Sequence, residues 1–201
     1  MARRKASEET RESFIIAALN LCREGGPEAV SARRLGRLLG LSQMAVYRHF
    51  QDMEDLLAHA WDRTYQQLLD HIQAAIFGEN PFKDLRAGLQ AYVGFGVDNP
   101  GLYRLMFFHH FERMEYLTSQ KTSLLALDLL RKTLATCLEQ KSISVDEQRL
   151  HFMTLQAWFT VHGLTTMAIS GRFQRVTEFL PEDLAGRLID EICESFLNRR
   201  R

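Results

Sequence analysis

The sequence lacks the patterns that mark secreted and membrane proteins. Its three cysteines, Cys22, Cys137 and Cys193, are widely spaced and odd in number. They predict buried free thiols rather than a disulfide framework, with a redox sensor as the alternative. No apolar run approaches the roughly 18 residues that a membrane helix needs, so we expect no membrane partner and a cytoplasmic location.

Catalytic patterns are missing as well. The sequence has no glycine-rich phosphate loop, no nucleophile motif and no carboxylate pair at a recognisable spacing. The adjacent histidines His109 and His110 point about 100° apart on a helix, and no carboxylate or thiol completes a metal-ligand set with them. We therefore expect no enzyme, no metal site and no cofactor.

Charge is zero overall but unevenly distributed along the chain. Residues 1–50 contain nine Lys or Arg and five Asp or Glu, a net charge of +4, and the remaining residues carry −4. A basic N-terminal segment on an acidic remainder is typical of a DNA-binding head attached to a body that does not bind DNA. A solvated charged surface without a partner is the alternative interpretation.

Strand-type alternation is almost absent, whereas helix-capping residues and glycine stops recur throughout. The sequence therefore predicts an all-α fold of about nine helices, with a head over residues 1–52 and a helical body over residues 53–201. Helices are expected at residues 7–25, 31–40, 42–50, 52–77, 82–97, 100–108, 115–139, 144–170 and 181–201.

Two short helices joined by the tight turn Gly40–Ser42 predict a helix-turn-helix. We expect Leu35, Leu38 and Leu39 to form the inner face of the first helix, with Leu41 at the corner. Val46 and Phe50, four residues apart, form the inner face of the second, which leaves polar groups suited to a major groove outside. A surface helix with assorted polar residues is the alternative. The outward residues are Gln43, Met44, Ala45, Tyr47, Arg48 and His49.

The segment Ser31–Leu57 resembles the DNA-binding domain of the TetR family, over about residues 10–60. It combines a Leu-Gly-Leu-Ser turn with the helix end Tyr-Arg-His-Phe, an acidic residue and a Leu-Leu pair. Two positions depart from the family pattern: Met53 replaces a lysine that helps to hold the DNA backbone, and Gly36 replaces an alanine.

The resemblance implies a role for each matching residue. Arg33 and Gln43 match positions that read base edges, and the Met44 side chain is suited to pack on a thymine methyl group. Phosphate contacts are implied for Ser31, Tyr47 and His49, and either role for Arg48. The expected DNA-facing set also includes Arg34, Arg37, Ser42 and Ala45.

Further along the chain, Asn99–Phe107 and Trp158–Gly163 together resemble a TetR-like C-terminal domain with a Trp…His-Gly motif. This resemblance implies a ligand-binding and dimerisation body. Independently, the two C-terminal helices are each apolar on two faces, and we expect one face of each to meet a second copy in a four-helix interface. Both faces lying inside one chain is the alternative. The expected interface residues are Leu150, Met153, Ala157, Val161, Leu164, Leu184, Leu188, Ile192 and Phe196.

An aromatic-rich set predicts a pocket for a flat or lipophilic effector, although core packing is the alternative for each member. Its members are Phe95, Tyr103, Phe107, Phe108, His110, Met114, Trp158 and His162. We therefore expect a homodimeric repressor that binds double-stranded palindromic operator DNA and is released by a small effector. The alternative is a ligand-independent DNA-binding regulator or an activator.

Overall fold

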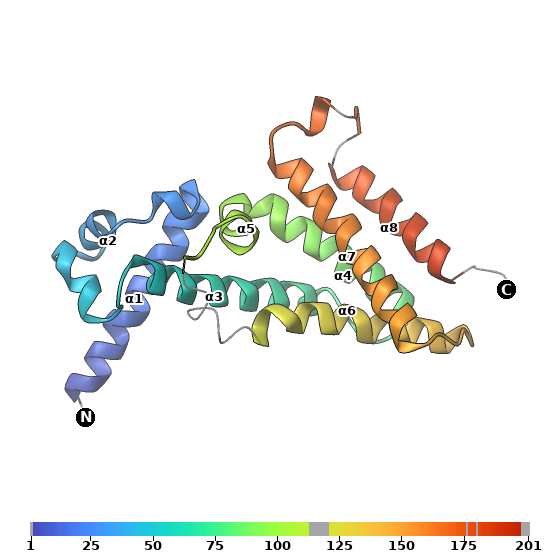
Figure 1. Cartoon of the computed structure of the whole chain (residues 1–201), viewed down its shortest axis with the longest axis horizontal. Coiled ribbons are helices and arrows are strands. Elements are labelled where there is room, and N and C mark those ends of the chain that lie inside the picture. The colour runs from blue at the N-terminus through green and yellow to red at the C-terminus, as the bar shows by residue number, and fades with distance from the viewer. Residues whose placement is uncertain (1, 113–120, 176, 180, 198–201) are drawn as a thin grey trace. The chain divides into compact units, whose positions relative to one another are not determined.

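A computed structural model of the chain describes residues 2–112, 121–175, 177–179 and 181–197. Within these residues all regular structure is helical, which confirms the predicted all-α fold (Figure 1). In this part of the chain each of the nine expected helices is present, one of them as a 3-10 helix, and two further 3-10 turns connect them. The elements are α1 (Ala2–Gly25), η1 (Pro27–Ala29), α2 (Ala32–Leu39), η2 (Gln43–Arg48), α3 (Met53–Ala74), α4 (Pro81–Asp98), α5 (Pro100–Phe107), α6 (Lys121–Gln140), α7 (Glu147–Ile169), η4 (Phe173–Arg175) and α8 (Pro181–Leu197).

The first helix begins earlier than the sequence predicted. It starts at Ala2 rather than after Ser7, because the intervening residues contain no glycine or proline to stop it and include good helix formers. The expected helix over residues 52–77 ends at Ala74, three residues early. Asp84 holds the turn that follows, since its carboxylate accepts the N–H groups of Phe77 and Gly78 at 3.1 and 3.2 Å.

The described chain forms two compact units. The first contains residues 1–66 together with 99–122, and the second contains residues 67–98 together with 123–201. The helix α5 therefore packs with the N-terminal elements, although it lies in the middle of the predicted body. The predicted division into a DNA-binding head, residues 1–52, and a body, residues 53–201, is a division by function and not by compact units. It stays a prediction.

In the first unit, α5 lies against the last turn of α1. Gly101 permits this contact, because a Cβ atom at this position would lie 1.9 Å from the carbonyl oxygen of Cys22. The other end of α5 is fixed by Trp61, whose Nε1–H donates to the carbonyl oxygen of Met106 at 3.1 Å. Helix α5 is thus held at both ends by the unit that contains the helix-turn-helix.

In the second unit, α4, α7 and α8 pack on one another, and α7 and α8 run side by side in Figure 1. Their shared core includes Leu89, Met153, Val161 and Ile189, each at most 3% exposed. Arg86 on α4 forms an ion pair with Asp190 on α8 at 2.9 Å.

All three cysteines are free thiols, as expected; Cys22 and Cys137 are buried, whereas Cys193 is only half-buried. Burial raises the pKa of Cys22 and Cys137 to about 12 and that of Cys193 to about 11. These thiols are protonated and poorly reactive at neutral pH. Among the helices that the structure describes, none has the length and apolar content needed to cross a lipid bilayer.

The close approach of α5 to α1 predicts a large penalty for any side chain at position 101. We expect Gly101→Ala to lower the free energy of unfolding by about 3 kcal/mol, because the added methyl group meets rigid backbone. Urea unfolding measures this change. Gly94→Ala on α4 is the control: its Cβ meets open space, so higher helix propensity stabilises this variant by up to about 1 kcal/mol. Equal stability of the two variants would contradict the packing described here.

Candidate DNA-binding interface

The helix-turn-helix is built by local capping. The Ser31 hydroxyl accepts the Arg34 backbone N–H at 3.3 Å and begins α2. Gly40 ends the helix with a left-handed φ of 67°, a conformation that favours glycine. The N–H of Leu41 then donates to the carbonyl oxygen of Gly36 at 2.8 Å and turns the chain toward η2.

Gly36 has a specific role in this turn. A Cβ atom there would lie 2.8 Å from the carbonyl oxygen of Leu41 and 3.1 Å from the backbone nitrogen of Gln43. The backbone leading into η2 therefore rests directly on α2. This contact explains why position 36 is glycine rather than the alanine of the family pattern.

The segment expected to enter DNA is a 3-10 helix, η2, that is anchored on one side. Val46 and Phe50 are buried, at 1% and 3% exposure. Phe14 on α1 meets the Phe50 ring edge-on at 6.4 Å and lies 5.9 Å from the His49 ring. The expected inner anchors of this segment are thus buried.

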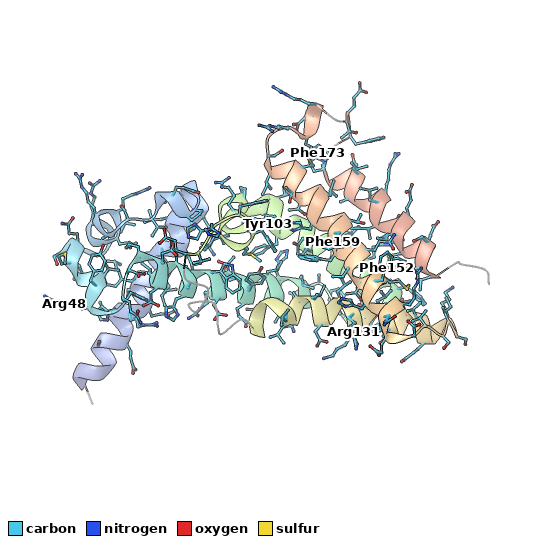
Figure 2. The ribbon with its side chains drawn as sticks, in the orientation of Figure 1. Arg48, Tyr103, Arg131, Phe152, Phe159 and Phe173 are labelled. Carbon is cyan, nitrogen blue, oxygen red and sulfur yellow. The ribbon has the colours of Figure 1, made fainter. Side chains whose placement is uncertain are left out.

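Most of the residues expected to face DNA are exposed: Arg33, Arg34, Arg37, Ser42, Gln43, Met44, Tyr47 and Arg48. Ser31, Ala45 and His49 are half-buried. Figure 2 shows Arg48 on the outer side of the ribbon. Exposed polar side chains therefore lie along both α2 and η2.

Leu38, expected on the inner face of α2, and Leu41, expected at the corner after it, are both exposed. Leu38 is 58% exposed and Leu41 is 40% exposed. Leu35 and Gly36 are the buried residues of α2, with Leu39 half-buried beside them. Because Leu38 lies about 110° from the centre of this face, it points to solvent. The inner face of α2 is narrower than the leucine pattern predicted.

A cation between α1 and α3 supports Phe50 from the other side. The Arg11 guanidinium lies 4.9 Å from the centre of the Phe50 ring and donates to Nε2 of His59 at 2.6 Å. Burial and the Arg11 charge lower the pKa of His59, although Asp55 opposes the shift. A neutral imidazole is the form that accepts this bond. The sequence analysis missed this cluster because Arg11 and His59 are 48 residues apart.

The start of α3 is fixed by reciprocal capping. The Asp52 carboxylate accepts the N–H of Asp55, and the Asp55 carboxylate accepts the N–H of Gln51, both at 2.9 Å. Glu54 accepts the N–H of Glu112 at 2.9 Å and lies 3.5 Å from Nε2 of His109. The segment after α5 is thus attached to the helix that follows η2.

The residues expected to line an effector pocket divide between the two units. In the first unit, Tyr103 is fully buried within α5, Phe107 is half-buried, and Phe108 and His110 are exposed. Tyr103 packs 4.7 Å from the Phe107 ring, and Phe107 lies 5.9 Å from Tyr65. Tyr103 is therefore a core residue of this unit. Met114 lies outside the described residues.

In the second unit, Trp158 and His162 converge on Tyr92, which the sequence analysis did not identify. The Trp158 Nε1–H donates to the Tyr92 hydroxyl at 3.3 Å, and this hydroxyl lies 3.0 Å from Nδ1 of His162. Burial lowers the pKa of His162 and so favours its neutral imidazole. Phe95 is buried on the same helix as Tyr92, 5.9 Å from the His71 ring.

The structure separates the two apolar faces of α7. The expected interface residues Leu150, Met153, Ala157, Val161 and Leu164 are all buried within their own chain. On α8, Ile192 and Phe196 are buried, and Leu184 and Leu188 are half-buried. The expected interface face of α7 is therefore occupied by the chain's own core.

The other face of α7 carries exposed apolar residues. Phe152 and Phe159 are 57% and 58% exposed, and Met167 follows two turns later at 37%. Figure 2 labels Phe152 and Phe159 along this helix. An open groove runs between them, lined by Phe152, Leu155, Gln156, Phe159 and Thr160. Among the described side chains, no group of three His, Cys, Asp or Glu residues is arranged to hold a metal ion.

Comparison with known proteins links this geometry to relatives. The chain is similar to the nucleoid occlusion factor SlmA of Enterobacter sp. (strain 638), with 30% identity over 115 residues. That match covers 54% of this chain and only 57% of the relative, so the similarity spans about half the length of that protein. An HTH-type transcriptional regulator of Staphylococcus aureus is 23% identical over 175 residues, covering 76% of this chain and 95% of that protein.

Solved structures share the fold. A protein of unknown function from a Rhodococcus species has a TM-score of 0.78 and 20% identity, covering 93% of this chain and 95% of its own. The TetR family transcriptional regulator PfmR from Thermus thermophilus has a TM-score of 0.66 and 21% identity, covering 90% of this chain and 97% of its own.

Two family models match the sequence itself. Residues 14–60 match the bacterial regulatory proteins of the tetR family, and residues 85–192 match the tetracyclin repressor-like C-terminal domain. The first match contains η2 and its anchors, and the second contains the Tyr92, Trp158 and His162 cluster. Both indicate a regulator of transcription rather than an enzyme. The chain belongs to the TetR family of DNA-binding transcriptional regulators.

Proposed function

We propose that this regulator is a cytoplasmic repressor that binds a palindromic operator as a homodimer and is released by a small lipophilic or aromatic effector. The observation that carries the DNA-binding part is the two-sided character of η2. Its apolar side is anchored by Val46 and by Phe50, which lies two residues after the helix, and its other side presents Gln43 and Arg48 to solvent. A short helix of this kind fits the major groove.

Within this surface we assign base contacts to Arg33 and Gln43, whose guanidinium and amide groups suit guanine and adenine. Met44, 59% exposed, is placed to pack on a thymine methyl group. Tyr47 and Ser31 hold phosphates and fix the register of the protein on the duplex. Met53 offers no charge where the family pattern has lysine, so one phosphate contact is absent from the proposed set.

The homodimer is supported by the exposed face of α7. Phe152 and Phe159 project from it, whereas a Cβ atom at Gly163 would meet no atom within 4 Å. Phe159 therefore projects from α7, and Gly163, one turn later, leaves a gap. A surface of this shape can pair with the same surface of a second copy of the chain about a two-fold axis. Two-fold symmetry in the protein requires matching half-sites in the DNA, hence a palindromic operator.

The arrangement of Trp158, His162 and Gly163 supports the assignment of the body to the Trp…His-Gly type. Trp158 and His162 bond to Tyr92 and join α7 to α4. Gly163, the next residue, lies on the exposed face. In this proposal Trp158 and His162 of the motif hold α7 to its own chain, and Gly163 leaves room for the partner on the opposite face.

Release by an effector is supported by the chain path between the units. Only Asn99 separates α4, which carries Tyr92 and Phe95, from α5, which is fixed to the DNA-binding unit through Gly101 and Trp61. An effector that binds the second unit and shifts the end of α4 therefore displaces α5 and the head. The effector changes the free energy of DNA binding by the difference between its own binding free energies for the DNA-binding arrangement and the displaced arrangement.

Operator recognition is tested with a duplex selected by the wild-type protein from random DNA. We expect Gln43→Ala to weaken binding to this duplex by about tenfold, because one bidentate base contact is worth roughly 1–3 kcal/mol. Fluorescence anisotropy measures the affinities, with Gln90→Ala, an exposed glutamine on α4, as the matched control. Equal losses in the two variants, or the failure of the wild type to select any sequence, would contradict the proposed base contact.

The dimer surface is tested by a charge at its centre. We expect the wild type to have twice the chain mass of 23.2 kDa and Phe159→Asp to be monomeric, since two carboxylates meet in an apolar contact. Analytical ultracentrifugation gives both masses. Phe77→Asp changes an 81% exposed phenylalanine outside α7 and should remain dimeric. A dimeric Phe159→Asp protein would remove this face from the interface.

Effector release is tested by screening lipophilic aromatic compounds for an increase in melting temperature. Compounds that raise it are expected to weaken binding to the selected duplex, because binding and release are linked. The same compounds should raise the melting temperature of Gln43→Ala equally, since Gln43 lies in the DNA surface. Stabilising compounds that leave DNA affinity unchanged, or a screen without any stabilising compound, would favour a ligand-independent regulator.

A further inference from the structure

Helix α2 carries three exposed arginines, which lie on two different faces of the helix. Arg33 and Arg37 are four residues apart and share a face, whereas Arg34 is turned about 100° from Arg33. The Arg34 guanidinium has two partners within the head. Its Nη1 donates to the carbonyl oxygen of Ala29 at 3.1 Å, and its Nη2 lies 3.3 Å from a Glu24 carboxylate oxygen.

These contacts join three consecutive elements. Glu24 belongs to the last turn of α1, Ala29 is the final residue of η1, and Arg34 lies in the first turn of α2. The backbone N–H of Arg34 is in addition held by Ser31, the cap of the same helix. Arg34 therefore fixes the direction in which α2 leaves the η1 turn.

The direction of α2 matters because the DNA surface is carried on it. Arg33 and Arg37 project from α2 itself, and the backbone entering η2 rests on Gly36. A small rotation of α2 consequently moves the proposed base-reading residues of both elements. Such a misplacement weakens recognition without removing any group that touches DNA.

The same geometry makes Arg34 a poor phosphate ligand. To reach a phosphate it would have to leave Glu24, and that carboxylate, 66% exposed, would then stand close to the DNA. While the pair is intact, the two charges cancel and provide little attraction for a phosphate. We propose that Arg34 is a positioning residue that orients α2 through Glu24 and Ala29, and is not itself a DNA contact.

The proposal rests on the DNA-binding role of the head, and Glu24 provides its sharpest test. Removing the Glu24 charge frees Arg34, so a positioning role and a contact role predict opposite changes. We expect Glu24→Gln and Arg34→Gln each to weaken binding to the selected duplex by about two- to fivefold, the range for an exposed ion pair. The double variant should be no weaker than either single variant, because both changes remove one interaction.

The salt dependence of DNA binding gives a second measurement, because a loss of protein stability alone does not change it. The slope of log affinity against log salt should be unchanged in Arg34→Gln, whereas a lost phosphate contact reduces it by about one. Arg34→Lys keeps the charge but cannot span two acceptors, so it should behave like Arg34→Gln. Circular dichroism melting identifies any variant that is not folded at the assay temperature.

Tighter binding by Glu24→Gln, a reduced salt slope in Arg34→Gln, or full affinity in Arg34→Lys would each overturn the positioning role. Failure of the wild-type protein to bind any selected duplex would instead count against the proposed operator recognition. The two failures are therefore distinguishable.

Discussion

The anchoring of η2 on the core of the head is the interaction on which the rest of this structure depends. Val46 and Phe50 are buried, and Phe14 meets Phe50 edge-on from α1. The Arg11 guanidinium covers the Phe50 ring from another side. Because the apolar side of η2 is fixed in this way, its polar side has one direction in which to point. A loosely held segment with the same residues would present no defined surface to a base pair.

The packing of α5 extends this constraint beyond the helix-turn-helix. Gly101 rests on the carbonyl oxygen of Cys22, so α5 contacts the turn from which η1 and α2 emerge. Arg34 reaches the same stretch of chain through Glu24 and Ala29. One short segment, residues 22–29, therefore receives α5 on one side and α2 on another.

Local chemistry explains which features the sequence could predict. Ser31, Gly40 and the Val46–Phe50 spacing act within a few residues of each other, so they predicted the turn and the anchors of η2. Long-range partners leave no such trace. Tyr92 is 70 residues from His162, and Arg34 gives no sign in sequence that it is paired with Glu24.

Helix α7 shows the limit of periodicity most clearly. Its pattern predicted two apolar faces, but period alone does not say which one the chain covers. The Leu150 face is internal and the Phe152 face is exposed. Tyr103 was predicted either to line a pocket or to pack in the core, and its ring is fully buried in the first unit. The sequence identified the apolar residues, but only the packing shows which of them lie in the core and which lie on the surface.

A crystal structure of the protein bound to its selected duplex tests the central claim most directly. The account predicts residues 43–48 inserted in the major groove, Val46 and Phe50 still buried against α1, and the side chains of Arg33 and Gln43 at base edges. A complex in which another element occupies the groove, or in which Val46 leaves the core to meet the DNA, would contradict it.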